Sequence, residues 1–555
     1  MRTIISRFSL VLAFALTASA QQTPAPDATP QTTPPPPSAQ QPAPQTPANT
    51  ITRNVSLVIL DGVVIDKQGN AVTDLKREDF QVTEDGDQQQ IRNFDVPGRY
   101  TPTPDITIDS TADLDRLAPR APVNIVLLDE FNTRFEDMAF ARYSLKKWLE
   151  KQPEKLDTPT MLVAVDLQHF TVLRDYTQNK DEIITALDHH FAAYPWQAHQ
   201  FAWIAERYTT AFYTLRRVAE ASLGHQGHKN MIWLGRGFPT IDRTRFTIDD
   251  NQRIFSAVQL TVNELRDARV TLYTIDPAGV MVDPGVYGSA ASLFAPFGGD
   301  PDFQSLARST GGRNLFGRND VDAEIGTSIR DGASLYTLTY RPSNENYDPT
   351  KFRKIKVTVD RPGLTFVTRQ GYFQDFRAAR PGPNGEVGRR LASELINAES
   401  SNMAYDAVPF TVTADPNDPN SLKFVVGPKG IGWYYTRGTK PRYTKLIVLT
   451  STFDRKGKEL KRDSELVSFN APPEITDSMA VNKAVSFNIK LDPNPKAVRA
   501  RLVVRVEASG HMGTADLTLG PGATASSSGA PGPTATPTPA AGSASNPAPG
   551  PSERP

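Results

Sequence analysis

The stretch that most constrains the fold of this chain is APVNIVLLDEFNT, residues 121–133. An apolar run over 123–128 ends in an acidic pair, Asp129 and Glu130, and a helical pattern follows from about 135 to 150. An apolar run that ends in a polar turn before a helix predicts a buried parallel strand and a crossover helix. Ligands of open α/β sheets bind at the carboxyl ends of the strands, so Asp129 is the first candidate for a site.

The pattern of a buried strand followed by a helix recurs downstream. Helical periodicity predicts helices near 181–190, 203–223, 250–268, 303–310 and 321–331. Short apolar runs predict further buried strands at 161–165, 230–234, 269–276 and 311–316. Strands that alternate with helices in this way predict a doubly wound sheet with mostly parallel strands.

Composition narrows the possible functions. The chain has 555 residues, with 61 basic and 61 acidic side chains and no cysteine. Balanced charge gives no net field to attract nucleic acid, and the absence of cysteine excludes disulfides, thiolate metal sites and a cysteine nucleophile. No zinc-protease, serine-hydrolase or phosphate-loop motif is present. We therefore expect a protein that is not an enzyme and does not bind nucleic acid.

The N-terminus has the pattern of a secretory signal peptide. Arg2 and Arg7 supply the basic start, an apolar stretch covers 8–16, and Ala18-Ser19-Ala20 fits a cleavage site after Ala20. The alternative, a membrane anchor, needs a longer apolar run. We expect a secreted protein, periplasmic or extracellular, with no membrane span after cleavage.

Changes in composition and periodicity predict a multi-domain α/β plus β fold. A Rossmann-like doubly wound domain is flanked by a small N-terminal Ig-like β module and a C-terminal β-sandwich. The predicted segments are a signal peptide (1–20), a Pro-rich disordered spacer (21–50), the small β module (51–97), a linker (98–120), the α/β domain (121–375), a second linker (376–390), the β-sandwich (391–519) and a disordered Gly/Ala/Ser/Pro tail (520–555).

Several sequence blocks together resemble a known family. VNIVLLDEFNT, GHKNMIWLGRGFP, RVTLYTIDPAGV and SLYTLTYRP occur in order, after DGVVIDKQGNAVTDLKREDFQVTEDGDQQQI. Over about residues 54–375 they resemble the acidobacterial VWFA-related domain proteins, a divergent branch of von Willebrand factor type A domains. The resemblance implies an α/β type A domain in an exported protein. Type A domains generally act in adhesion and complex assembly, often through a divalent metal.

The resemblance also implies where a metal would bind. Type A domains take oxygen ligands from a D-x-S-x-S loop, from a Thr ahead of a later helix and from an Asp after a central strand, a set that suits Mg²⁺. Mapped onto this sequence, the metal ligands are Asp129, Thr133 and Thr209, with Thr210 as the alternative to Thr209.

Two positions depart from the type A pattern. Phe131 stands where the first Ser is needed and has no donor oxygen, and the final Asp is replaced by Gly235 and Arg236. We therefore expect a degenerate site with no cofactor other than weakly held Mg²⁺. The alternative is that Asp129 caps the following helix or pairs with Arg236.

Two smaller patterns remain. His225 and His228 form an H-x-x-H pair, which falls short of the three or four ligands that zinc requires. Three consecutive aromatics, 433–435, predict either an exposed binding platform or core packing.

The expected function is binding to a protein partner, in adhesion or envelope assembly. The expected binding residues are Asp129, Glu130, Asn132 and Arg236. Two alternatives stay open: a hydrolase that uses carboxylates of the C-terminal half, and a structural envelope component with a vestigial site.

Overall fold

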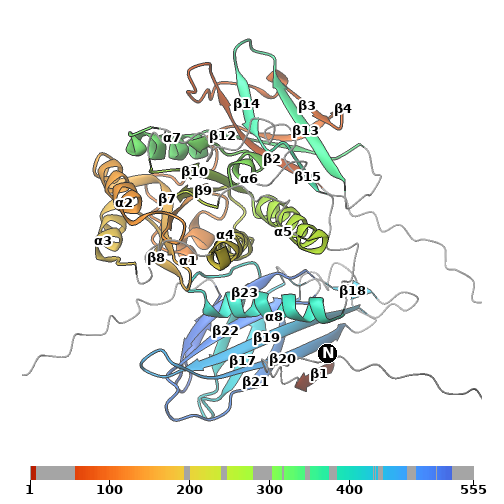
Figure 1. Ribbon diagram of the computed structural model, residues 1–555. Helices are drawn as coiled ribbons and strands as arrows, with labels where there is room; N and C mark the ends of the chain where they lie inside the picture. Colours follow the sequence, from red (N-terminus) through yellow and green to blue (C-terminus); the bar gives the residue numbers. More distant parts are fainter. Residues whose placement is uncertain are drawn as a thin grey trace, which may run out of the picture.

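The computed structural model describes most of the chain between residues 57 and 527. The described residues are 2–7, 57–192, 201–238, 247–278, 303–315, 318–343, 351–373, 384–428, 431, 433–435, 442–471, 483–507 and 509–527. Figure 1 shows three layers: two small sheets at the top, a sheet with helices in the middle, and two further sheets with one long helix at the bottom. The expected spacer, 21–50, lies outside the described residues, as do most of the expected signal peptide and tail.

The middle layer is a six-stranded mixed sheet. Its order is β11-β10-β9-β6-β7-β8, in which β8 runs antiparallel to β7 and the other neighbours are parallel. Its strands are β6 (Val123–Asp129), β7 (Lys155–Val165), β8 (Phe170–Asn179), β9 (Lys229–Leu234), β10 (Val270–Ile275) and β11 (Asn314–Leu315). Every residue of β6, β9 and β10 is buried, which is why these strands read as continuous apolar runs.

Helices cover this sheet because neighbouring side chains of a strand point to opposite faces. Val126 and Leu128 of β6 share a core with α2, α3 and α7, whereas Ile125 and Leu127 share a core with α1, α4, α5 and α6. The helices are α1 (Thr111–Leu117), α2 (Phe135–Glu150), α3 (Lys180–His189), α4 (Phe201–Ala221), α5 (Ile248–Asp267), α6 (Phe303–Ser309) and α7 (Val321–Ala333).

The upper two sheets join distant parts of the sequence. One has the order β14-β2-β12-β5 and the other β15-β13-β3-β4, and all their pairings are antiparallel. Their strands are β2 (Val58–Ile65), β3 (Phe80–Glu84), β4 (Asp87–Gln89), β5 (Ile91–Asp95), β12 (Leu335–Tyr340), β13 (Phe352–Val359), β14 (Thr365–Thr368) and β15 (Gly371–Phe373). A single core of aromatic and aliphatic side chains holds the two sheets together.

The lower layer is formed by the C-terminal part of the chain together with β1 from the N-terminus. Two sheets, with orders β1-β20-β19-β22-β23 and β21-β17-β16-β24, share one apolar core, and β18 pairs with β19. The helix α8 (Asn384–Ser400) lies between this layer and α4 (Figure 1). The strands are β1 (Arg2–Arg7), β16 (Phe410–Ala414), β17 (Ser421–Val426), β18 (Tyr434–Tyr435), β19 (Arg442–Phe453), β20 (Glu459–Ala471), β21 (Val485–Lys490), β22 (Arg499–Val506), β23 (Met512–Thr518) and β24 (Thr524–Ser526).

The predicted fold class, a doubly wound Rossmann-like type A domain flanked by separate β modules, is wrong. The described chain is mostly β, with five sheets, and the one sheet that has parallel strands is mixed because β8 is antiparallel. The N-terminal strands do not form an Ig-like module of their own, since β2 and β5 pair with β12 and β3 pairs with β13. Hydrophobic periodicity is a local signal. It predicts that a segment forms a strand, but it does not reveal which distant strand pairs with that segment.

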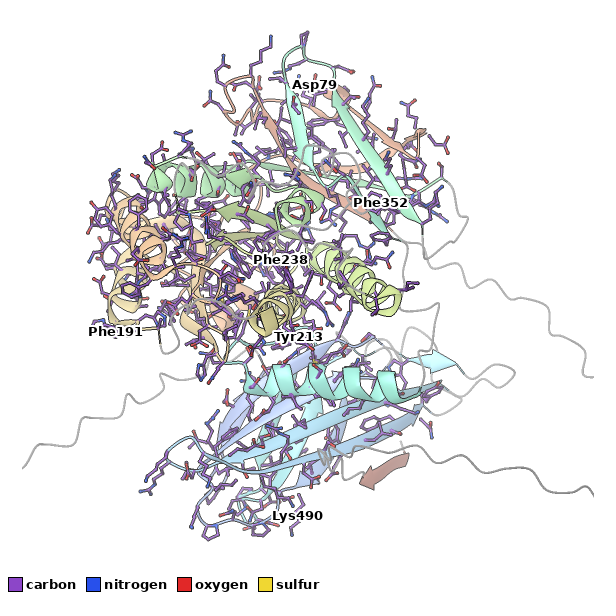
Figure 2. The ribbon with its side chains drawn as sticks, in the orientation of Figure 1. Asp79, Phe191, Tyr213, Phe238, Phe352 and Lys490 are labelled. Carbon is purple, nitrogen blue, oxygen red and sulfur yellow. The ribbon has the colours of Figure 1, made fainter. Side chains whose placement is uncertain are left out.

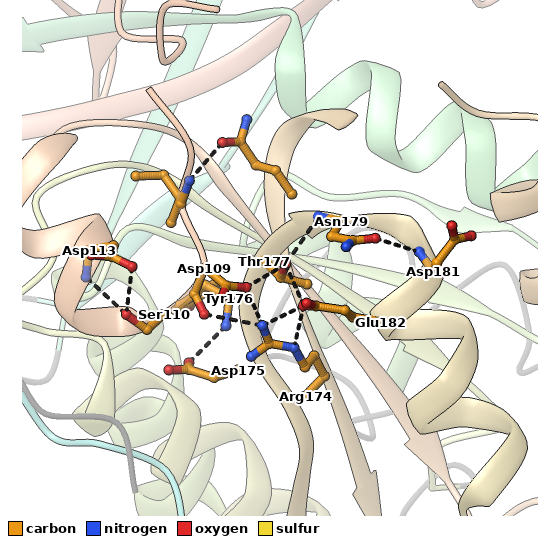
Figure 3. Close-up of polar contacts among 12 residues, drawn as sticks. Asp109, Ser110, Asp113, Arg174, Asp175, Tyr176, Thr177, Asn179, Asp181 and Glu182 are labelled. Carbon is orange, nitrogen blue, oxygen red and sulfur yellow. Dashed lines mark hydrogen bonds and ion pairs between the residues drawn. The ribbon is translucent and has the colours of Figure 1, made fainter. Parts of the chain in front are cut away.

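Segments expected to be linkers contain ordered elements. The stretch 98–120 includes α1, and Ile108 and Leu114 belong to the core of the middle layer. Figure 3 shows how polar contacts attach this stretch to the sheet edge: Arg174 Nη2 of β8 donates to the carbonyl of Asp109 over 3.2 Å, and Thr177 Oγ1 donates to Asp109 Oδ1 over 3.0 Å. The start of the expected tail includes β24.

The described helices include none that is both long and apolar enough to cross a membrane.

Candidate functional site

Asp129 is the last residue of β6, in the centre of the middle sheet, and is fully buried. Its position follows from the sequence, because the apolar run of β6 leads directly into the turn before α2. The backbone N–H of Glu130 still donates to the carbonyl of Val165, 3.0 Å away, so sheet pairing continues one residue past the strand. The carboxylate is therefore held at the carboxyl edge of the sheet with little freedom.

Three N–H groups donate to the carboxylate of Asp129. Trp233 Nε1 and the backbone N–H of Gly237 donate to Oδ2 over 2.9 and 3.0 Å, and the backbone N–H of Asn132 donates to Oδ1 over 2.9 Å. Burial raises the pKa of Asp129 to about 6, although these hydrogen bonds oppose the shift. The carboxylate thus ties β6, β9 and the turn before α2 together.

Two glycines allow the chain after β9 to approach Asp129. Gly235 has a φ of +147°, and a Cβ atom there would lie 2.4 Å from Thr133 Oγ1 and 2.5 Å from the Cβ of Asp129. Gly237 has a φ of +62°, and its Cβ would lie 2.1 Å from the ring of Phe303. The departure from the type A pattern at Gly235 is therefore the feature that lets a backbone N–H reach the carboxylate.

The residues around Asp129 do not fit a divalent cation. A divalent cation needs several oxygen ligands with free lone pairs, and N–H groups already occupy three of the roughly four lone-pair sites of Asp129. Among the residues that the structure describes, no group of three or more His, Asp or Glu side chains is arranged to hold a metal. The arrangement suits a structural carboxylate.

We expect calorimetric titration with Mg²⁺ or Mn²⁺ to show no binding that depends on Asp129. The Asp129→Asn variant keeps the shape of the side chain and removes its charge, so it serves as the control. Micromolar binding to the wild type that this variant loses would contradict the expectation.

Of the other predicted metal ligands, the structure shows one beside Asp129. Thr133 is buried beside Asp129, and its Oγ1 accepts the backbone N–H of Arg236 over 3.2 Å. Thr209 lies on an exposed position of α4, and Thr210 is half-buried. The structure thus places Thr133 with Asp129, where the hydroxyl orders the backbone.

Neither alternative role expected for Asp129 is found. Arg236 Nε lies 3.6 Å from Asp276 Oδ2, just after β10, which gives the Arg236 side chain a different carboxylate. The N-cap residue of α2 is Arg134, and no side chain caps this helix. Arg207 of α4, which the sequence analysis did not single out, is the cation whose charge acts on Asp129.

Glu130 forms a second buried contact at the same edge. Its Oε1 and Oε2 lie 2.9 and 3.1 Å from His190 Nε2, at the end of α3. Arg142 Nη2 of α2 donates to the carbonyls of Leu187 and His190 over 2.6 and 2.7 Å. Glu130 and Arg142 together fix the end of α3 against α2.

Asn132 is buried in the same turn, and its side-chain Nδ2 has no hydrogen-bond partner among the described residues. A buried N–H group without an acceptor is costly. Asp129, Glu130 and Asn132 therefore do gather in one turn, as predicted, while Arg236 follows β9 and faces Asp276.

Three large aromatic side chains are exposed on α2 and just after α3: Phe135 at the start of α2, Tyr143 about two turns further along it, and Phe191 directly past the end of α3. Phe135, Tyr143 and Phe191 have exposed fractions of 67%, 62% and 85%. Phe135 lies on the same face of α2 as Arg142, two turns before it, and Phe191 directly follows His190. Figure 2 shows Phe191 at the edge of the molecule by the end of α3. We call these three residues the aromatic face.

The two histidines of the H-x-x-H pair lie at the opposite edge of the sheet, before β9. His225 Nε2 lies 2.7 Å from the carbonyl of Ala121, and His228 Nδ1 lies 3.4 Å from Asp61 Oδ2. Burial lowers the pKa of both histidines, that of His225 to about 3. His225 is held by the carbonyl of Ala121, whereas neither ring nitrogen of His228 has a hydrogen-bond partner among the described residues and its nearest carboxylate is that of Asp61.

Of the aromatic stretch 433–435, Trp433 is half-buried and packs against the core of the lower layer. This favours core packing for Trp433. Tyr434 and Tyr435 form β18, which pairs with β19.

Comparisons with known proteins give little guidance. No family model and no curated protein matches the chain. Among solved structures, it is similar to proximal thread matrix protein 1 from the mussel byssus, with 12% identity, a TM-score of 0.25, and coverage of 43% of this chain and 51% of that chain. The chain thus spans about half the length of that protein.

Two further structures are similar to a comparable degree. The human COPII-coat protein Sec24c has 10% identity, a TM-score of 0.22, and coverage of 74% of this chain and 43% of that chain. An uncharacterized membrane spanning protein from Vibrio fischeri has 15% identity, a TM-score of 0.12, and coverage of 38% and 97%. Likenesses this weak carry no inference about fold or function.

Proposed function

We propose that this chain is a non-catalytic protein-binding component of an extracytoplasmic compartment, and that its partner docks on the aromatic face. The proposal keeps the binding function expected from the sequence and drops the type A fold and the metal. The single observation that carries it is the exposure of Phe135 and Phe191, one at the start of α2 and the other next to His190, which contacts Glu130 of the buried turn.

The aromatic face has the composition of a protein interface. Aromatic residues are enriched at interface centres, where they bury a large area and lose little conformational entropy. Exposed apolar side chains that cluster, unlike scattered ones, mark interaction sites. The contacts of Arg142 and Glu130 with the end of α3 hold Phe191 and Phe135 on one rigid surface, so little ordering is required on binding.

The location rests on the N-terminal sequence. Arg2, Arg7 and the A-x-A site at 18–20 form the pattern of a secretory signal peptide. An exported protein with an exposed aromatic surface fits a role in adhesion or envelope assembly, in which contacts to another protein are the activity.

A photo-crosslinking experiment tests the proposal. A photoreactive phenylalanine analogue at position 191 is expected to give one discrete cross-linked protein in an envelope extract, and the Phe135→Ser variant is expected to lose it. Because Phe135 is exposed, its replacement should change the free energy of unfolding by less than about 0.5 kcal/mol, so loss of the product reports binding and not misfolding.

The matched control is the same photoreactive group at Ile248, which is 78% exposed at the start of α5. We expect no discrete product from that position. The same set of products from positions 191 and 248, or no product at 191, would contradict the proposal.

A further inference from the structure

The strand β20 lies at one edge of its sheet in the lower layer, where the N-terminal strand β1 covers part of it (Figure 1). On its other side, β20 pairs with β19 from Glu459 to Ala471. β1 runs antiparallel to β20, with Arg2 opposite Asn470 and Arg7 opposite Glu465. Residues 2–7 therefore pair with main-chain groups that an edge strand would otherwise leave open.

The two halves of β20 differ in charge. Residues 459–463 include four charged side chains, and such charges protect an edge strand from pairing with other chains. Residues 464–470, SELVSFN, carry one charge, on Glu465. Val467 and Phe469 of this half are buried in the core of the lower layer. The part of the edge with the fewest charges is thus the part that β1 covers.

The expected signal peptide includes the whole of β1. Arg2 and Arg7 supply its basic start, and cleavage after Ala20 removes β1 from the chain. This cleavage depends on the export that the proposed function includes. The cleaved chain keeps the core of the lower layer, which residues between 408 and 517 form, but the edge of β20 is then open. Unpaired N–H and C=O groups along an edge are a template for another strand.

We propose that, in the exported protein, the edge of β20 at 465–470 binds an extended segment of a partner protein, which adds an antiparallel strand in the place of β1. Strand addition takes its affinity from main-chain hydrogen bonds and its specificity from alternate side chains. The register of β1 defines the chemistry of the segment. It has a basic residue opposite Glu465 and uncharged residues opposite Val467 and Phe469.

Charge favours a partner strand over a second copy of this chain. Glu465 is buried and carries the one charge of the stretch 464–470, and β1 places Arg7 opposite it. Opposite charges stabilise a cross-strand pair. Two copies of β20 that pair antiparallel about Ser468 would place Ala471 opposite Glu465. That arrangement gives the carboxylate no basic residue on the neighbouring strand.

Disulfide trapping tests the proposal, because the chain has no cysteine of its own. The cleaved chain, which begins at Gln21, is prepared as Ser468→Cys and incubated in a glutathione buffer with a peptide of residues 2–7 that carries Ile4→Cys. Ile4 is opposite Ser468 in the register of β1, near enough for a disulfide after a small local shift. We expect about tenfold more linked complex than with the Ile5→Cys peptide, because neighbouring residues of a strand point to opposite faces.

Three controls separate strand addition from non-specific thiol exchange. Thr411→Cys places the thiol on an exposed position of β16, which pairs with β17 and β24 on its two sides, so neither peptide should be preferred. A Ser468→Cys chain that keeps residues 1–20 should form about tenfold less complex, because β1 occupies the edge. A further Arg7→Glu change in the Ile4→Cys peptide should lower the yield about fivefold, because like charges then face each other.

Equal yields from the Ile4→Cys and Ile5→Cys peptides, or no product from either, would overturn the proposal. A disulfide-linked dimer of the Ser468→Cys chain as the main product would identify a second copy as the occupant and overturn it as well. N-terminal sequencing separates this proposal from the proposed function. Retention of residues 2–7 in the cell would count against both, whereas failed trapping on the chain that begins at Gln21 would overturn strand addition alone.

Discussion

Replacing Asp129 with alanine is expected to lower the free energy of unfolding by about 3 kcal/mol at neutral pH, measured by urea denaturation. The variant leaves Trp233 Nε1 and the backbone N–H groups of Asn132 and Gly237 without an acceptor in a fully buried site. It also opens a cavity beside Gly235. The contacts of Asp129 predict loss of structure at this edge of the sheet, with no loss of a metal.

The decrease in the free energy of unfolding caused by Asp129→Ala should be larger in acid than at neutral pH. Burial raises the folded-state pKa of Asp129 from 3.8 to about 6. A raised pKa means that the folded state favours the protonated carboxyl, so this contribution to stability is complete below about pH 4 and is lost as the pH rises through about 6. The difference between wild type and Asp129→Ala should therefore shrink from pH 4 to pH 7, by up to about 3 kcal/mol.

Asp157→Ala is the matched control, because Asp157 lies on an exposed position of β7. Its effect should stay within about 0.5 kcal/mol at both pH values. An Asp129→Ala variant that unfolds at the same urea concentration as Asp157→Ala would refute the structural role of Asp129.

The second large effect is expected for Asp61→Ala, which should lower the free energy of unfolding by about 3–5 kcal/mol. Asp61 of β2 is buried, and Arg269 donates to both its oxygens over 2.6 and 3.0 Å. Thr337 Oγ1 of β12 donates to Oδ1 over 2.6 Å. Since Arg269 directly precedes β10, this carboxylate attaches the upper sheets to the middle sheet. Its removal leaves a largely buried guanidinium without its partner.

This contribution has the opposite pH dependence. Burial alone would raise the pKa of Asp61, but Arg269 and His228 outweigh it and hold the pKa well below its usual value. A lowered pKa means that the stabilisation is present above about pH 4 and is lost as the pH falls further. The gap in urea midpoint between wild type and Asp61→Ala should thus be wide at pH 7 and narrow in strong acid.

Asp74→Ala is the control for Asp61→Ala. Asp74 also pairs with an arginine, Arg361, at 2.9 Å, but its side chain is 70% exposed. Exposed pairs contribute about 0–1 kcal/mol. Equal losses for Asp61→Ala and Asp74→Ala would show that burial of the Asp61 pair does not matter.

The sequence pattern correctly predicted the strands and the helix next to Asp129. The predicted strand and helix around Asp129 are confirmed as β6 (Val123–Asp129) and α2 (Phe135–Glu150), and the predicted strand at 230–234 is β9. These elements are long or fully buried, so their hydrophobic patterns are strong. The pairing of β2 with β12, across more than 250 residues, has no local signal, and this is where the predicted fold class failed.

The sequence predicted the position of the candidate site, but it did not predict the hydrogen-bond partners of its residues. The prediction that Asp129, Glu130 and Asn132 form one turn at the sheet edge needed only their positions after an apolar strand. Their partners come from elsewhere: Trp233 from β9 and His190 from the end of α3. Hydrogen bonds between residues about 60 or 100 positions apart are set by packing, which the sequence pattern does not encode.

The sequence by itself determined that an acidic side chain ends a buried strand and that glycines follow the strand at 230–234. Only the tertiary structure decided the consequence. The glycines let the chain after β9 approach until the Gly237 N–H reaches Asp129. Because three N–H donors then satisfy this fully buried carboxylate, it stabilises the edge of the sheet.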